Sequence, residues 1–314
     1  MLVRRPLTLF VLGISLSAVA CGGGGGSGVV APPVTPPVTP PLDTTGFLEF
    51  TAGTAPLVIV APHGGALKPA TIPDRTCAGC EVLADANTAD LARLIVEAFE
   101  RRTAKRPFLA LNQLHRVKFD GNRDMDEATG SHVILNGVWN SWQINLDSAT
   151  ARAARIGGRA LYLEVHGHAH EVARIELGYL LTGTQLRLSD SALTVGSVMR
   201  QSSIARLVTD ARSGATEVSL LRGAASLGAL LTGAGYPAVP SPSDPAPKAA
   251  DSYFTGGYNT VRHGSRDGGA TDAIQMECYF AGLRDTAENR AAFADQVAAA
   301  LVEFLLKQYG WPAS

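Results

Sequence analysis

The chain has 314 residues, with 27 lysines and arginines against 28 aspartates and glutamates, which gives a formal net charge of −1. Because there is no basic surplus, we expect no nucleic-acid partner. The length beyond residue 45 is sufficient for one large domain with a substantial hydrophobic core.

The N-terminus predicts export. Two arginines precede an apolar run, and small residues then lead to Cys21. The run is too short for a comfortable membrane span and is typical of a signal peptide, which we assign to residues 1–20. The sequence Ser-Ala-Val-Ala-Cys at 17–21 resembles a lipobox, in which the cysteine is lipidated and becomes the new N-terminus. The alternative is an ordinary cleaved secretory signal.

Residues 21–45 are predicted to be a tether. They contain a glycine run and a Pro-Pro-Val-Thr repeat, and neither composition can form a packed core. We therefore expect a globular domain at 46–314 that is exported and anchored to a bacterial membrane through a lipid on Cys21, at its periplasmic or outer-membrane face.

The first half of the domain predicts a βαβ unit. A continuous apolar run at 57–61 is closed by Pro, His and two glycines, which indicates a strand buried on both faces. Residues 85–105 carry apolar side chains at helical spacing and end in basic residues. A second apolar strand is expected near 108–112.

The second half continues the alternation. Residues 226–269 are rich in Gly, Pro, Ser and Asp, so we expect a long surface excursion that borders a site. Alternating strands and helices predict a three-layer α/β/α domain with a mixed, mostly parallel central sheet. The further expected elements are helices at 141–156 and 286–309 and strands at 160–167, 173–183 and 272–280.

Polar residues close three of the predicted strands. His63, His166 and Glu277 each lie at or near a strand end, where ligands bind in open α/β sheets. Histidines also stand at positions 168 and 170, and on a regular strand they would share a face with His166. One strand would separate them too widely for a single ion, so we expect His166 to be the ligand, His168 to line the substrate rim, and His170 to be structural or exposed.

A hydrolytic zinc site needs about three nitrogen or oxygen ligands, an open position, and a carboxylate that handles the proton. His63 and His166 supply two of these ligands. The third is expected from the segment after the first strand, where Asp85, Glu81 and Asp74 are the candidates. Asp85 also lies where a helix N-cap would stand.

The cysteines point to a different role. Cys77 and Cys80 form a CxxC in a loop-like segment, and in an exported protein we expect a local disulfide. A zinc ribbon would need a second CxxC, which the sequence lacks. Cys278 is expected to be a buried free thiol.

Several motifs occur in a characteristic order: "VIVAPHGG" with "IPDR", "DANTADLA", "HRVKFDGNR", "LEVHGH" and "IQMECYFAGLRD". Over nearly all of residues 55–310 the chain resembles the N-formylglutamate amidohydrolase family, which is grouped with zinc carboxypeptidases and succinylglutamate desuccinylases in a phosphorylase/hydrolase-like fold. The resemblance implies that His63, Asp85 and His166 bind zinc and that Glu277 is the general base.

The same resemblance implies roles in substrate binding. Asn122 and Arg123 of "DGNR" match the pair that holds the substrate carboxylate, a task suited to a bidentate guanidinium. Arg116 is a candidate for stabilising the oxyanion or binding a second carboxylate, and the alternative for Arg116 is a surface salt bridge. The chain departs from the family where "DxHS" and "EINR" would stand, because it has "EVHGHAHE" and "MECYFAGLRD".

The expected activity is therefore zinc-dependent hydrolysis of an amide in a small carboxylate-bearing substrate, such as an N-acyl amino acid or a peptide fragment. One alternative is a non-catalytic metal- or ligand-binding lipoprotein of the same fold. A second is a histidine phosphatase, because Arg262-His263-Gly264 resembles the motif of that family. The motif lies late in the chain, so we expect His263 to line the substrate pocket instead. No GxSxG sequence supports a serine hydrolase.

Overall fold

The computed structural model describes residues 46–77, 79–194, 197–210 and 215–311. The predicted signal peptide, the predicted lipidation site at Cys21 and the predicted tether lie outside the described residues. Within those ranges, no helix combines the length and the apolar character that a membrane span requires.

Within the described residues, seven strands form one mixed sheet in the order β1-β3-β2-β4-β7-β5-β6. The four central strands, β3, β2, β4 and β7, run parallel, whereas β1 and β5 are antiparallel to their inner neighbours. The strands are β1 (Leu48–Thr51), β2 (Leu57–Ala61), β3 (Phe108–Asn112), β4 (Ala160–Gly167), β5 (Ile175–Gly178), β6 (Ala238–Val239) and β7 (Thr271–Cys278).

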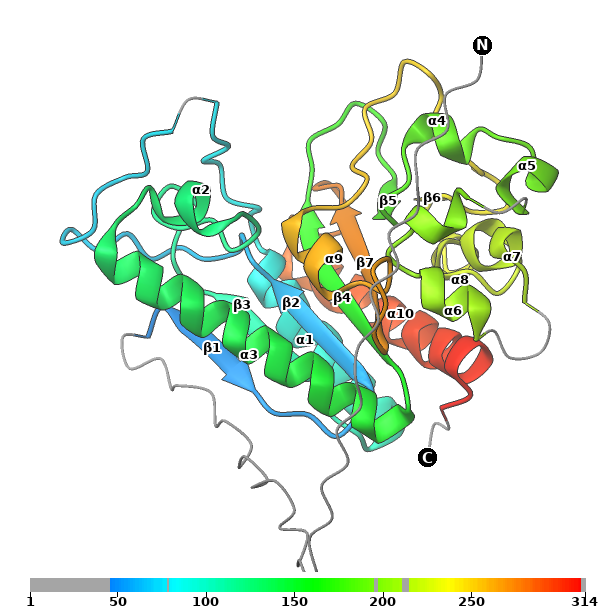
Figure 1. The fold of residues 1–314 in the computed structure, drawn as a ribbon, viewed down its shortest axis with the longest axis horizontal. Coiled ribbons are helices and arrows are strands. Elements are labelled where there is room, and N and C mark those ends of the chain that lie inside the picture. The colour runs from blue at the N-terminus through cyan, green and yellow to red at the C-terminus, as the bar shows by residue number, and fades with distance from the viewer. Residues whose placement is uncertain (1–45, 78, 195–196, 211–214, 312–314) are drawn as a thin grey trace, which may run out of the picture. The chain divides into compact units, whose positions relative to one another are not determined.

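Helices cover both faces of this sheet. The helix α3 (Val133–Gly157) crosses one face, and α1 (Thr88–Thr103) and α10 (Ala287–Phe304) lie behind the sheet in Figure 1. Each face has its own apolar core, and every residue of β2, β3 and β7 is buried. Continuous apolar strands are what a sheet covered on both faces requires. The predicted three-layer α/β/α fold with a mostly parallel sheet is confirmed.

Short helices fill the chain between β5 and β7, of which the sequence analysis predicted only residues 226–269, as a surface excursion. The expected surface excursion at 226–269 contains α8 (Leu227–Gly233), β6 and α9 (Tyr258–His263). The segment before it forms further short helices: α4 (Gly183–Leu186), α5 (Asp190–Thr194), a 3₁₀ turn (Met199–Gln201), α6 (Ala205–Thr209) and α7 (Glu217–Arg222). Helices of one or two turns are too short to show a periodic apolar pattern.

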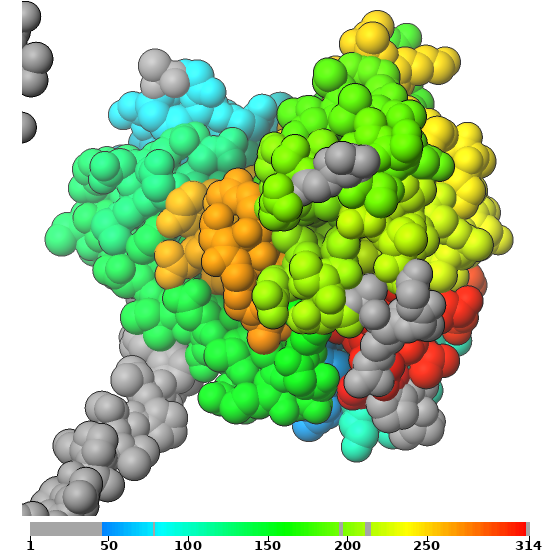
Figure 2. All heavy atoms as spheres, turned by 45° about the vertical axis from the view of Figure 1, so that its right-hand side comes forward, coloured from blue at the N-terminus to red at the C-terminus, as the bar shows by residue number. Residues whose placement is uncertain are grey.

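Contacts of the α9 segment join the short helices between β5 and β7 to the rest of the domain. In Figure 2 the residues around α9, in orange, lie at the surface between the green α3 layer and the yellow-green short helices. Arg262 forms an ion pair with Asp147 of α3 at 2.7 Å, and the Ser265 amide donates to the Ser203 carbonyl at 2.8 Å. Two smaller helices complete the fold: α2 (Met125–Thr129) and a π-helical turn (Leu305–Tyr309) that extends α10.

Candidate metal centre

Three parallel strands deliver the predicted residues to one edge of the sheet. His63 follows β2 by two residues, and His166 of β4 pairs in register with Glu277 of β7. The Asp85 amide donates to the His63 carbonyl at 3.0 Å, which brings the start of α1 beside the strand ends. Gly64 permits this approach, because a Cβ there would lie 2.4 Å from the Ala89 nitrogen.

His63, Asp85 and His166 form a group that could hold a metal ion. Their donor atoms all lie within 4.8 Å of one another, and all three residues are buried. Asp85 Oδ2 is 3.4 Å from His63 Nδ1 and 3.0 Å from His166 Nδ1. The three side chains line a cavity of about 210 Å³ together with Glu277.

The contacts of the three acidic candidates for the third metal ligand differ. Asp74 is 61% exposed at its side chain, pairs with Lys118 at 2.7 Å, and is not among the described residues that line the cavity. Glu81 lines the cavity, but its Oε1 accepts the backbone amides of Val82 and Leu83 at 2.8 Å each. Asp85 is the acid that faces both histidines. It is not the helix cap, because the N-cap of α1 is Asn87.

Two further carboxylates face the outer nitrogens of the histidines. Asp120 Oδ1 lies 2.6 Å from His63 Nε2, and Glu164 Oε2 lies 3.3 Å from His166 Nε2. Carboxylates at this position fix the tautomer and orientation of metal-binding histidines. We infer that Nε2 of His63 carries the proton, because it is hydrogen-bonded to Asp120, and this leaves the Nδ1 lone pair of His63 directed toward Asp85. His63 Nδ1 is buried and has no hydrogen-bond partner, so the donor set fits a zinc ion.

The electrostatics of the cavity favour an added positive charge. Although burial acts in the opposite direction, the carboxylates of Glu277, Asp85 and Glu164 hold the pKa of His166 well above its usual value. Burial raises the pKa of Glu277 to about 7. Among the described groups, four buried acids surround the two imidazoles: Asp85, Asp120, Glu164 and Glu277. A bound cation would offset this concentration of negative charge.

Arg116 is part of this network and not a surface salt bridge. Its Nε donates to Asp120 Oδ2 at 2.9 Å, and one terminal nitrogen lies 3.6 Å from Asp85 Oδ1. The residue is buried and lines the cavity. Its guanidinium therefore stands where a developing negative charge next to the metal group would be stabilised.

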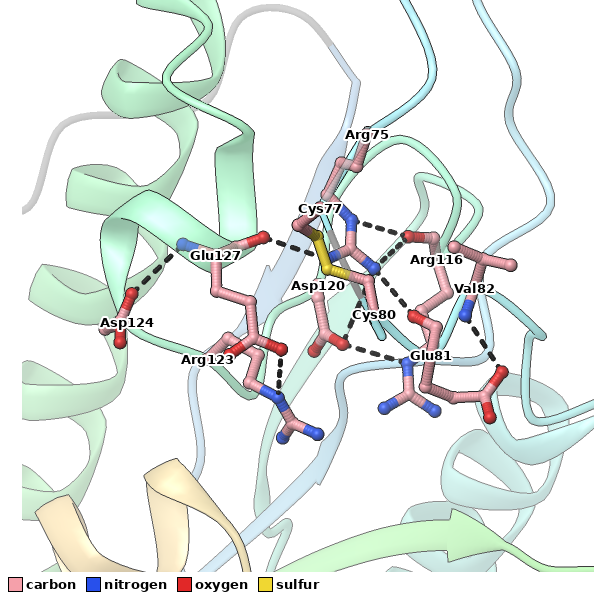
Figure 3. The surroundings of a disulfide bond; sticks show 10 residues. All are labelled: Arg75, Cys77, Cys80, Glu81, Val82, Arg116, Asp120, Arg123, Asp124 and Glu127. Carbon is pink, nitrogen blue, oxygen red and sulfur yellow. Dashed lines mark hydrogen bonds and ion pairs between the residues drawn. A yellow bond between two sulfur atoms is a disulfide. The ribbon is translucent and has the colours of Figure 1, made fainter.

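Behind Arg116, the buried Arg75 ties several backbone segments together, as Figure 3 shows. Its guanidinium donates to the carbonyls of Arg116, Glu81 and Glu127 at 2.8 to 3.0 Å and lies 3.7 Å from Asp120 Oδ2. The predicted disulfide between Cys77 and Cys80 is present beside Arg75. The predicted free thiol, Cys278, is buried in β7.

Asn122 and Arg123 also line the cavity. Asn122 Nδ2 lies 3.4 Å from His166 Nε2, and Asn122 Oδ1 accepts a hydrogen bond from the backbone amide of Asn259 at 2.8 Å. Arg123 Nε donates to Glu127 at 2.8 Å while part of its side chain stays exposed. Their role in holding a substrate carboxylate stays a prediction.

His168, His170 and Glu176 are close enough together to form a second candidate metal group. His168, however, uses both ring nitrogens: Nε2 donates to the Arg174 carbonyl at 2.9 Å, and Nδ1 accepts the His170 amide at 3.1 Å. His170 Nδ1 lies 2.9 Å from Glu176. This arrangement does not fit a metal ion.

The expectation for His263 needs correction. Among the described residues, those that line the metal cavity do not include His263. Its side chain is 2% exposed, the ring stacks on Tyr162 at a centroid distance of 5.0 Å, and Nδ1 lies 3.5 Å from Asp147. The Arg-His-Gly motif places this histidine at the end of α9, where it packs in the interior. Such a buried ring cannot act as a phosphoryl acceptor.

No family model and no curated protein sequence matches the chain. Solved structures do. N-formylglutamate amidohydrolase from Ralstonia eutropha JMP134 matches with 17% identity and a TM-score of 0.48, over 83% of this chain and 97% of that one. N-formylglutamate amidohydrolase is thus among the structural neighbours of this chain.

Two cell-wall amidases are further neighbours. The CwlD amidase from Clostridioides difficile, solved with the GerS lipoprotein, shares 9% identity, with a TM-score of 0.33 over 79% of this chain and 98% of that one. The N-acetylmuramyl-L-alanine amidase Ami1 from Mycobacterium smegmatis shares 15%, with a TM-score of 0.32 over 79% and 96%. These likenesses concern the fold.

Proposed function

We propose that the chain is a metal-dependent hydrolase, with zinc as the metal, that cleaves an amide bond in a small carboxylate-bearing substrate. One observation carries the proposal: His63, Asp85 and His166 converge at the strand ends, and each histidine has a buried carboxylate at its outer nitrogen. The substrate class is an N-acyl amino acid or a peptide-like fragment.

Asp120 and Glu164 orient the two imidazoles, so the ligand atoms are preorganised before any ion binds. When bound, zinc would polarise the scissile carbonyl and lower the pKa of a water molecule. Two imidazoles and one carboxylate form a ligand set typical of catalytic zinc sites, which keep a position open for water.

Glu277 is the proposed general base. It is buried beside His166 and lines the same cavity, and its Oε1 accepts a hydrogen bond from Gln275 Nε2 at 2.8 Å. The carboxylate takes a proton from the attacking water and delivers it to the leaving nitrogen. Arg116 stabilises the oxyanion that develops on the carbonyl.

Asn122 and Arg123 hold the substrate carboxylate in this proposal, because a guanidinium binds carboxylates in a bidentate manner. With the export signal and the lipidated Cys21 predicted from the sequence, the enzyme would act at a bacterial membrane face. Its substrates would then be peptides, peptidoglycan fragments or scavenged N-acyl amino acids.

The test uses the full-length protein and a panel of N-acyl amino acids and small peptides, with amine release as the readout. We expect hydrolysis that is lost on chelation and restored by zinc. Glu277→Gln should keep its zinc and lose about 10²- to 10⁴-fold in kcat. Glu171→Gln, at an exposed position near β4, is the matched control and should retain wild-type rates.

Two outcomes would overturn the proposal. A Glu277→Gln variant with full activity would remove the general base. Zinc that binds stoichiometrically without hydrolysis of any panel member would instead favour a non-catalytic metal-binding protein of the same fold.

A further inference from the structure

A second, larger cavity opens directly from the metal cavity. Its volume is about 540 Å³, against about 210 Å³ for the metal cavity. The two share part of their walls, namely Glu81, Asp85, Arg116, Gly167 and Phe254. A molecule bound at the metal ligands can therefore extend from the metal cavity into the larger cavity.

Apart from the shared residues, the wall of the larger cavity consists of apolar side chains on one part and of His168, His170 and Arg284 on the other. Leu83 is 73% exposed, Phe254 42% and Phe280 45%, and all three line it together with several alanines. Single exposed apolar side chains are common on protein surfaces, whereas a cluster around one hollow marks a binding site. The volume lies within the range of small-molecule sites.

Phe254 is held in place at the boundary between the two cavities. Its ring stacks on His170 at 4.6 Å between centroids, and its amide donates to Glu176 Oε2 at 2.8 Å. The buried Glu176 also contacts His170 Nδ1 at 2.9 Å. His170 and Glu176, which belong to the group that does not fit a metal, thus position the Phe254 ring beside the metal cavity.

Arg284 fixes the other side of the larger cavity. Its guanidinium donates to the carbonyls of Cys278, Ala86 and His168 at 3.1, 2.6 and 3.3 Å, so it joins three segments of the chain. It also lies 5.1 Å from the centre of the Phe280 ring. The Arg284 guanidinium is therefore occupied by contacts within the protein. The apolar part of the pocket wall beside it is formed by Leu83, Phe254, Phe280 and alanines.

The position of Arg123 indicates which end of a bound substrate would enter the larger cavity. Asn122 and Arg123 line the metal cavity, but they are not among the residues that line the larger one. A substrate whose carboxylate is held at Arg123, with its scissile carbonyl at the metal ligands, therefore extends its acyl group toward Phe254 and Leu83. A formyl group has no carbon beyond the carbonyl and would leave this pocket empty.

We propose that this pocket is an acyl subsite and that the natural substrate is an N-acyl amino acid with a long apolar acyl chain. The proposal rests on the proposed function. In the reaction the amide C–N bond breaks, the water oxygen joins the carbonyl carbon, and both water protons end on the nitrogen, which yields a fatty carboxylate and an amino acid with a free ammonium group.

The experiment measures kcat/KM of the full-length, zinc-loaded protein on N-formyl-, N-acetyl-, N-hexanoyl- and N-decanoylglycine. Glycine has no side chain, so only the acyl group can fill the pocket. We expect kcat/KM to rise roughly twofold to fourfold for each added methylene until the pocket is full. Leu83→Ser and Phe280→Ala should lower the decanoyl-to-acetyl ratio at least tenfold. Leu306→Ser, another exposed leucine, is the matched control and should leave the ratio unchanged.

Failure of this proposal is distinguishable from failure of the proposed function. Hydrolysis of the formyl and acetyl substrates with no gain for longer chains would overturn the acyl subsite and leave the hydrolase standing. If no substrate is hydrolysed, calorimetric binding of N-decanoylglycine decides. Binding that is at least tenfold tighter than that of N-acetylglycine, and weakened by Leu83→Ser, would support the pocket. Equal binding would overturn it.

Discussion

Asp120 Oδ1 lies 2.6 Å from His63 Nε2, on the edge of the ring opposite the nitrogen that faces Asp85. Burial opposes its ionisation, but His63 and Arg116 hold the pKa of Asp120 well below its usual value. The residue is therefore a permanent carboxylate that accepts the Nε2 proton. This contact makes His63 available to a metal through Nδ1.

The first prediction concerns this orientation. Asp120→Asn and Glu164→Gln should each weaken zinc binding about 10- to 100-fold, because the outer carboxylate fixes the tautomer of the ligand and raises its basicity. Competition with a chromophoric chelator would measure the affinity. Asp74→Asn is the control, since Asp74 pairs with Lys118 at the surface. Unchanged affinity in both variants, with unchanged thermal stability, would show that neither carboxylate supports a metal ligand.

Arg75 should matter more to stability than the disulfide beside it. Arg75→Met leaves three carbonyls and Asp120 without a buried cation and should cost about 3 kcal/mol of unfolding free energy. The Cys77→Ser/Cys80→Ser pair should cost about 2 kcal/mol or less, because the bridged cysteines are only three positions apart. Denaturant unfolding of the two variants would compare them. A larger loss for the serine pair would reverse this ranking.

His263 should contribute to acid sensitivity. Burial lowers the pKa of His263 to about 4, from 6.5 for the exposed side chain. Between these values the unfolded chain binds a proton that the folded chain does not, so stability is complete above pH 6.5 and declines as the pH falls toward 4. The loss amounts to up to about 3 kcal/mol. His263→Phe, which keeps a ring against Tyr162, should remove this part of the decline.

The difference in unfolding free energy between wild type and His263→Phe is first measured at pH 8. The histidine is neutral in the folded and the unfolded chain at that pH, so this difference reports packing alone. As the pH falls to 4, the difference should shift in favour of the phenylalanine variant. Parallel pH profiles for the two proteins would mean that His263 titrates alike in the folded and unfolded chains.

Three of the four central strands could be predicted to the residue, whereas β7 was predicted at 272–280 and observed at Thr271–Cys278. The expected bounds of β2, β3 and β4 are those observed, since each is an apolar run between residues that break strands. The helix α3 begins eight residues before the predicted start. Its first turns expose Val133 and Ile134 to solvent, so they show no amphipathic pattern.

Within the candidate site, strand ends identified the histidines and Glu277, whereas Arg116, Asn122 and Arg123 were predicted from the family resemblance. His63, His166 and Glu277 each follow or end an apolar run, and the structure brings them together with Asp85. Asp120 reaches His63 across 57 positions, and no local pattern marks that contact. His263 was misplaced for a related reason: a short motif in a glycine-rich segment gives no information on burial. Phe254 was missed because its contacts with His170 and Glu176 join segments that are far apart in the sequence.

The central claim is that the strand-end histidines hold a metal. Elemental analysis of the purified full-length protein, beside a His63→Ala/His166→Ala double variant, tests it most directly. We predict about one zinc per chain in the wild type and none in a double variant that remains folded by circular dichroism. Absence of metal from both proteins, even after incubation with zinc, would contradict the claim and leave the histidines with a purely structural role.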